Sequence, residues 1–347
     1  MAPFRSTLAK SAAKLFGVFN TADLGLRGAS SSNKANYINV VVFGATGGTI
    51  WYAPAPNGPA GQTRYYKVHA FTNSASTENF QVTELNSDSA FPASVEYYAI
   101  GGGGGGGSVQ HTNGSGGGAG GFLTGNFTAS ANTYTIRVGA GGAADNNGTP
   151  SYIDGPDISA QTAWGGGKGG PNSTAGTPGG SGGGAGGNDG PQRAGGVGDR
   201  QTGTSTPTGS SPVQGYPGGV GSGTGGGADN MAGGGGGAGQ AGGNGSGPGG
   251  PGSPQPGGYG KAIPSSWGVP SSYGAPGPDG SLRYFAGGGG AAGHPEGGGA
   301  FGAGGYGGGA GAGNPAVATS GGGGAGPGLA SAAGSVYVRY FYNKSSD

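Results

Sequence analysis

GGGGGGG at residues 101–107 and GGGGG at residues 233–237 show the glycine-rich composition that decides the fold. Glycine accounts for 97 of the 347 residues, and 69 of these glycines lie between residues 165 and 330. Glycine has no side chain to bury and loses the most backbone freedom on folding. The same region holds only ten valine, leucine, isoleucine or phenylalanine residues. It therefore cannot build an ordinary hydrophobic core.

Two states remain for such a region: a disordered low-complexity tract, or a lattice of extended glycine helices. Glycine and proline together make up 121 residues without a strict period, which favours disorder. A helix with three residues per turn has no internal hydrogen bonds, so its N–H and C=O groups point outward to neighbouring helices. At about 0.5–1.5 kcal/mol for each bond, a dense network offsets the lost entropy. We expect the lattice, packed as polyglycine II-type helices. Collagen is excluded because the unbroken glycine runs lack G-X-Y triplets.

Charge and composition exclude several classes of protein. Fifteen lysines and arginines balance fourteen aspartates and glutamates, so nothing steers the chain to phosphate or to an anionic membrane surface. No Arg-Gly-Gly triplet occurs, and we expect no nucleic acid partner. The chain has no cysteine, and no run of eighteen apolar residues predicts a membrane span.

The N-terminal segment, residues 1–28, predicts a short amphipathic helix. Lys10 and Lys14 interrupt the apolar core that a signal peptide would need. The residues of the apolar stripe recur at helical spacing: Leu8, Ala12, Leu15 and Phe19. Such a helix either packs on its own domain or anchors the chain to its own copies or to a larger particle. We expect attachment and oligomerisation, because a glycine-rich domain offers little apolar surface to pack against.

Strand patterns follow the helix and a serine-rich linker. Strands are predicted at residues 37–43, 49–52, 64–71, 79–85, 95–100, 122–127, 134–138, 158–164 and 335–342. We expect a mainly β fold, with a small antiparallel sandwich in residues 29–100 and a hairpin formed by 122–127 and 134–138. The last strand alternates apolar residues, so the chain returns to its first sheet and 165–334 becomes a long insertion. The chain is predicted to divide into an attachment and assembly helix at 1–28, a small β domain at 29–100, a glycine-rich domain at 101–342 and a tail at 343–347.

The segments that carry a resemblance are YYKVHAFTNSASTENFQVTE at 65–84, VEYYAIGGGGGGG at 95–107, GGAGGFLTGNFTASANTYTIRVGAGG at 117–142, SAQTAWGGGKGG at 159–170 and GSVYVRYFY at 334–342. Together they resemble the glycine-rich domain of bacteriophage tail-fibre and other virion proteins. The tract is also similar in character to the polyglycine adhesins at the tips of some long tail fibres, in which loops between glycine helices contact the host receptor. The resemblance carries over no individual receptor residue.

Motifs that suggest cofactors or catalysis are incomplete. VVVFGATGGTI at 40–50 lacks the third glycine and the following helix of a dinucleotide site, so a strand running into a turn is the expected structure. GGGKGG at 165–170 lacks the upstream glycine and the hydroxyl residue of a phosphate loop. His69, His111 and His294 lie far apart without matching ligands. We expect no enzyme, no cofactor and no metal site.

Two islands of other residues, at 188–217 and 259–285, interrupt the glycine tract. Loops on a rigid scaffold commonly carry recognition, and aromatic rings with an arginine suit sugar or protein surfaces. The candidate receptor contacts are Tyr259, Trp267, Tyr273, Arg283, Tyr284 and Phe285. The alternative is that these aromatics only cap the edges of the glycine lattice.

The sequence therefore predicts a structural protein of a phage virion, a tail fibre or host-attachment adhesin at the particle surface. The alternatives are a capsid-surface or neck decoration protein with a purely structural role, or a glycine-rich protein of a host cell wall. The expected partners are other virion proteins, further copies of the chain, with a homotrimer favoured, and a receptor on the host surface.

Overall fold

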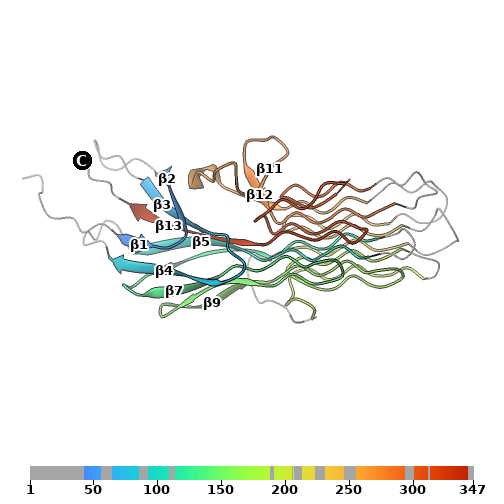
Figure 1. Ribbon diagram of the computed structural model, residues 1–347, viewed down its shortest axis with the longest axis horizontal. Coiled ribbons are helices and arrows are strands. Elements are labelled where there is room, and N and C mark those ends of the chain that lie inside the picture. Colours follow the sequence, from blue (N-terminus) through green and yellow to red (C-terminus); the bar gives the residue numbers. More distant parts are fainter. Residues whose placement is uncertain are drawn as a thin grey trace, which may run out of the picture.

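The computed structural model describes residues 43–55, 65–85, 93–108, 114–187, 191–204, 206, 213–222, 231–245, 255–293, 301–311 and 313–342. These residues form a mainly β protein without an α-helix among them. A β-sandwich lies at one end, and a bundle of long extended segments projects from it (Figure 1). The predicted N-terminal helix, with Leu8, Ala12, Leu15 and Phe19, lies outside the described residues.

Two five-stranded antiparallel sheets form the sandwich. The first sheet has the order β1-β4-β7-β8-β9 and the second has the order β2-β3-β13-β5-β6. The strands of the first sheet are β1 (Gly44–Thr46), β4 (Thr77–Glu84), β7 (Thr133–Arg137), β8 (Ser151–Gly155) and β9 (Ile158–Ala163). Those of the second are β2 (Thr49–Pro54), β3 (Tyr65–Phe71), β13 (Ser335–Tyr342), β5 (Ser94–Ile100) and β6 (Phe122–Thr128).

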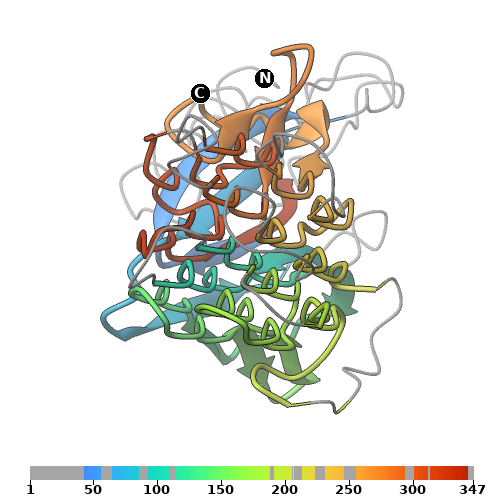
Figure 2. The same cartoon turned by 90° about the vertical axis from the view of Figure 1, so that its right-hand side faces the viewer.

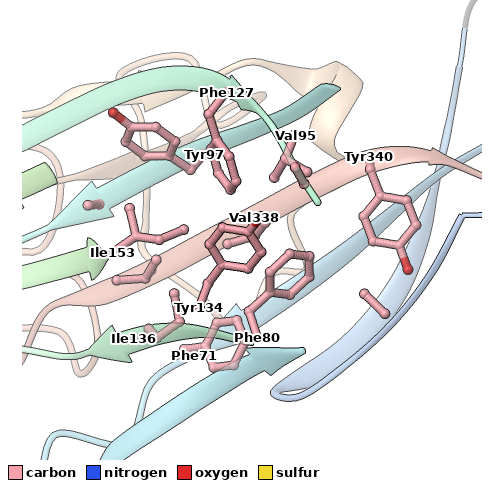
Figure 3. Packing of buried hydrophobic residues seen from close by; sticks show 14 of the residues in the cluster. Phe71, Phe80, Val95, Tyr97, Phe127, Tyr134, Ile136, Ile153, Val338 and Tyr340 are labelled. Atoms are coloured by element: carbon pink, nitrogen blue, oxygen red, sulfur yellow. The ribbon is translucent and has the colours of Figure 1, made fainter. Parts of the chain in front are cut away.

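The sandwich core is the apolar layer between these sheets, and it is rich in aromatic rings (Figure 3). Alternate residues of each strand point into it, as the period of a strand requires. Phe71, Phe80 and Tyr134 are fully buried there. Val336, Val338 and Tyr340 enter the same layer from the last strand, so the alternation predicted for residues 335–342 is confirmed.

The last strand, β13, lies in the middle of the second sheet. It pairs antiparallel with β3 on one side and with β5 on the other. The predicted return of the chain to its starting sheet is therefore confirmed. Both faces of β13 are buried, because its other face is covered by a second apolar cluster that includes Tyr337.

One sequence prediction about this region was wrong. Residues 122–127 and 134–138 do not form a hairpin: β6 pairs with β5 in the second sheet, whereas β7 pairs with β4 and β8 in the first. The connection passes from one sheet to the other, and each strand turns its apolar face to the core between them. The sheets also join strands from both sides of residue 100, since β6 to β9 and β13 belong to the sandwich.

A small third sheet covers the outer face of the second sheet. It contains β10 (Lys261–Ile263), β12 (Arg283–Phe285) and β11 (Ala275–Pro276), with the 3-10 helix η3 (Ser265–Trp267) between β10 and β11. Short strands here were not predicted, because three residues are too few to show a period. Ile263, Trp267 and Phe285 pack with Tyr337 and Ile100 to form the second apolar cluster.

The glycine bundle consists of extended segments that run back and forth along the long axis of the molecule and stack beside one another, as the end-on view shows (Figure 2). We define it as the described parts of 101–121, 139–149, 164–198, 214–260 and 286–334. Most of its glycines are buried. Because no side chains separate the segments, their backbones are in direct contact.

Hydrogen bonds between segments repeat at every third residue. The N–H groups of Gly101, Gly104 and Gly107 donate to the carbonyl oxygens of Gly121, Gly118 and Ser115 at 2.8–2.9 Å. The intervening residues bond in the same way to other neighbours. Gly102 and Gly105 donate to Thr149 and Asn146, and Gly103 and Gly106 donate to Ala332 and Leu329. Successive N–H groups along one segment thus point to three different neighbours in turn.

The chain enters and leaves the sandwich at the end farthest from the bundle. Gly44 at the start of β1 pairs with Glu84, and Tyr342 at the end of β13 pairs with Tyr65. The opposite end of the second sheet runs directly into the bundle, because Ile100 precedes the glycines at 101–107. The two ends of the molecule therefore differ. Both ends of the described chain lie at one pole, and the glycine segments extend to the other (Figure 1).

Candidate binding surface

The second aromatic island lies at the sandwich end of the bundle, not at its free tip. The segment ending at Gly260 leads into β10, and the segment beginning at Gly287 leads away from β12. Part of the first island reaches the same end: the Gln214 side chain donates through Nε2 to the Thr162 carbonyl and accepts through Oε1 from the Trp164 N–H. Both islands therefore join the bundle to the sandwich.

Trp267 and Phe285 are packing residues. They are 2% and 0% exposed, respectively. The Trp267 ring lies edge-on to Tyr98 with their centroids 4.8 Å apart, and its carbonyl oxygen accepts a hydrogen bond of 2.9 Å from Trp51 Nε1. Neither ring has a surface to offer a receptor, so these two residues leave the candidate set. Both rings belong to the second apolar cluster, where burial of a large ring stabilises the fold.

Arg339 fixes η3 to the second sheet. Its guanidinium lies between two rings, 4.0 Å from the centroid of Tyr66 and 4.3 Å from that of Trp267. Nε and Nη2 donate to Glu96 Oε2 at 2.8 and 2.6 Å, and Nη1 donates to the Ser266 carbonyl at 3.1 Å. A guanidinium is planar and has donors on three nitrogens, so it can stack and form all of these bonds together.

Arg283, Tyr273 and Tyr284 also serve the internal structure of the island. Arg283 donates to three carbonyl oxygens, those of Ser271, Tyr273 and Gly274, and so closes the loop before β12. The Tyr273 ring stacks on Trp51 with centroids 5.7 Å apart. All three side chains are half-buried. They keep partial surface, while Arg283 and the Tyr273 ring make the contacts above within the fold.

Tyr259 is the member of the predicted set that is most exposed, at 45%. Its ring meets that of Tyr306 edge-to-face with centroids 4.9 Å apart. Tyr216, on another outer segment of the bundle, is also exposed, and exposed Gln240 lies between it and Tyr259 in the hydrogen-bonded order of segments. We call Tyr216, Tyr259 and Tyr306 the tyrosine row.

Sequence reasoning missed Tyr216 and Tyr306, although a signal was present. Outer segments carry a non-glycine residue at every third position, as with exposed Pro256 and Tyr259, and with exposed Ala303 and Tyr306. This spacing is the repeat of the hydrogen bonds. It marks the side of each segment that faces away from its neighbours, and a tyrosine at such a position is a surface residue.

The motifs considered for cofactors and metals take other roles. Gly47 and Gly48, with φ of 111° and 61°, form the turn between β1 and β2, so the expected turn is present; residues 37–42 of the expected strand lie outside the described residues. His69 is fully buried, and its Nδ1 lies 2.7 Å from the Gly47 carbonyl. Within the described residues, no group of three or more histidine, cysteine, aspartate or glutamate side chains could hold a metal ion. His111 and His294 lie outside them.

Electrostatics near the tyrosine row are weak. Burial lowers the pKa of Lys261, partly offset by the nearby Asp199, and Lys261 Nζ donates to the Val213 carbonyl at 3.1 Å. The three tyrosines and Gln240 are uncharged at neutral pH. The surface they form therefore presents aromatic rings, hydroxyl groups, an amide and bare peptide backbone.

A search of the described residues for a helix long and apolar enough to cross a membrane finds none. No protein family, curated protein or solved structure matches this chain.

Proposed function

We propose that this chain is a structural virion protein of a phage, a tail fibre or host-attachment adhesin that carries a rigid glycine-rich domain. The observation behind the proposal is that the molecule differs between the two ends of its long axis. Both ends of the described chain emerge from the sandwich at one pole, and the glycine bundle projects from the other. A projection with one pole for attachment and one for presentation suits a particle appendage.

The glycine segments support this proposal as polyglycine II-type helices. A three-residue turn without internal hydrogen bonds explains why successive N–H groups of residues 101–107 point to different neighbours. The result is a rod stiffened by backbone bonds in several directions, which holds its shape without disulfides in a chain that has no cysteine. An appendage outside the cell benefits from such stiffness.

Hydrogen exchange tests the lattice. Amides of residues 233–237 should exchange orders of magnitude more slowly than those of an unstructured glycine peptide, because each donates to a carbonyl of another segment. Complete exchange within seconds would contradict the lattice.

Immunogold labelling of the assembled particle tests the function. Antibodies against the purified chain should label a fibre or another projection of the virion. Label on the capsid or neck would instead favour the alternative of a decoration protein with a purely structural role. Absence of the chain from purified virions would overturn the proposal, and label in a bacterial or plant cell wall would support the remaining alternative.

A further inference from the structure

We propose that the tyrosine row binds a neutral polysaccharide, in a site on the flank of the bundle beside the third sheet. This inference deepens the proposed role in host attachment and depends on it for its biological meaning. Tyr216, Tyr259 and Tyr306 are 38%, 45% and 41% exposed, and they lie on outer segments that follow one another in the hydrogen-bonded order.

The backbone links place the three tyrosines on neighbouring outer segments of the bundle, and only the rings of Tyr259 and Tyr306 are in contact. The Tyr216 N–H donates to the Gly237 carbonyl at 3.0 Å, and the Gln240 N–H donates to the Tyr259 carbonyl at 3.1 Å. The Gly260 N–H in turn donates to the Tyr306 carbonyl at 2.6 Å. The chain turns at residues 237–240 between the first two tyrosines, and the last two rings are in contact.

The surface around the rings favours a sugar over a protein partner. The residues bonded to the tyrosine backbone are Gly237, Gly239 and Gly260, which carry no side chain, while the exposed Val213 and Pro217 lie on the Tyr216 segment. A ring face that rises from bare backbone can stack on the C–H face of a pyranose, while the Gln240 amide and the tyrosine hydroxyls can bond to sugar hydroxyls. Recognition of an apolar surface on a protein partner would instead need aliphatic side chains between the rings of this chain.

The tyrosine row favours a neutral chain, because the nearby cation, Lys261, is half-buried and its Nζ already donates to the Val213 carbonyl at 3.1 Å. Tyr216, Gln240, Tyr259 and Tyr306 carry no charge that would pair with a carboxylate or phosphate. The site is also preorganised, since every tyrosine belongs to a segment whose backbone is bonded to its neighbours. Binding then costs little ordering entropy beyond that of the two side-chain torsions of each tyrosine.

The test is an array of purified bacterial surface polysaccharides, neutral O-antigens and exopolysaccharides beside acidic capsular ones, probed with the full-length chain. We expect binding to a neutral polysaccharide, weakened at least about tenfold in the double variant Tyr259→Ala/Tyr306→Ala. Tyr259→Phe/Tyr306→Phe should keep most of the affinity because the rings remain. Tyr52→Ala is the matched control, since Tyr52 is 53% exposed and lies on β2 in the sandwich.

Several outcomes would overturn the inference. These are no binding to any neutral polysaccharide, binding only to acidic ones, or equal binding by the alanine double variant while its unfolding midpoint matches that of the wild type. A self-association of the wild type that the double variant abolishes would assign the row to a second copy instead. Immunogold labelling is independent of the array, so failure of the virion role and failure of the sugar site can be told apart.

Discussion

The individual glycine is the unit on which the bundle depends. A Cβ built on Gly235 would lie 1.9 Å from the Gly117 carbonyl oxygen and 2.4 Å from its carbon. Real Cβ atoms do not approach backbone so closely, and the contacted backbone cannot move without breaking its own hydrogen bonds. The same holds for Gly104, whose added Cβ would lie 2.3 Å from the Gly167 oxygen. A methyl group inside the bundle therefore acts as overpacking against a rigid wall.

Gly235→Ala should consequently destabilise the protein by about 3 kcal/mol or more. Gly280→Ala is the control, because no atom lies within 4 Å of a Cβ built there and only its φ of 71° is unfavourable for alanine. That strain costs about 1–2 kcal/mol. Chemical denaturation measures both variants. If Gly235→Ala unfolds no earlier than Gly280→Ala, the close packing of the segments around residue 235 is incorrect.

His69 makes stability depend on pH. Its Nδ1–H donates to the Gly47 carbonyl, and its Nε2, 3.3 Å from Tyr340 Oη, accepts from that hydroxyl. Burial lowers the pKa of His69 from 6.5 to about 4, and the nearby Lys67 lowers it further, against the opposing effect of the bond to Gly47. The folded state thus favours the neutral ring.

The sign of the effect follows from proton binding. Above pH 6.5 both states are neutral and the full stability is present. As the pH falls from about 6.5 to about 4, His69 binds a proton in the unfolded chain but stays neutral in the folded chain, and about 3 kcal/mol of stability is lost. His69→Gln should remove this part of the slope. Parallel pH profiles of the unfolding free energy for wild type and variant would contradict the assignment.

Among the elements, η3 and the third sheet depend on Arg339 for their position. The arginine lies in β13, so the last strand both completes the second sheet and holds the island that covers it. Its charge is paired with Glu96 at 2.6 Å, which offsets the cost of burying the guanidinium. The island is thus joined to the sandwich by the contacts of Arg339 and by the hydrogen bond from Trp51 Nε1 to the Trp267 carbonyl, within an aromatic cluster.

Arg339→Lys should destabilise the protein by about 1–3 kcal/mol, because an ammonium cannot stack between Tyr66 and Trp267 while bonding to Glu96 and Ser266. Amide exchange should accelerate in residues 261–285 before it does so in the sandwich. Arg137→Lys, at an exposed position of β7, is the control and should change stability by less than about 0.5 kcal/mol. Equal effects of the two substitutions would show that the stacked geometry contributes nothing.

For the whole molecule, the two poles differ in what they present. The described chain begins at Phe43, at the sandwich pole opposite the glycine bundle. Residues 1–28 lie outside the described residues. The apolar stripe of Leu8, Ala12, Leu15 and Phe19 remains a prediction, as does the homotrimer.

Replacing both Leu15 and Phe19 with aspartate should release the chain from its oligomer or from the virion, while the sandwich and the bundle stay folded. Burial of these side chains between copies would contribute about 1.5–3 kcal/mol each, and a buried unpaired carboxylate reverses that gain. Sedimentation measures the mass, and an unchanged unfolding midpoint controls for folding. Wild-type mass together with wild-type incorporation into virions would place attachment elsewhere.

The sequence by itself determined the class of structure. Alternating apolar residues predicted most strands of the sandwich, including β13, and the scarcity of large side chains limited the glycine tract to disorder or a backbone lattice. These features are local, so they are visible without coordinates. The period of three on the outer segments was visible too, and it would have marked Tyr306 beside Tyr259 as a surface residue.

Only the tertiary structure decided which strands share a sheet and which aromatics are exposed. Residues 122–128 and 133–137 have the local pattern of a hairpin, but they pair with β5 and with β4 and β8 in opposite sheets. Trp267 and Tyr259 belong to one island, yet one is buried against Arg339 and the other lies at the surface. Burial depends on partners far away in the chain, and glycine segments carry no side-chain pattern that would specify those partners in advance.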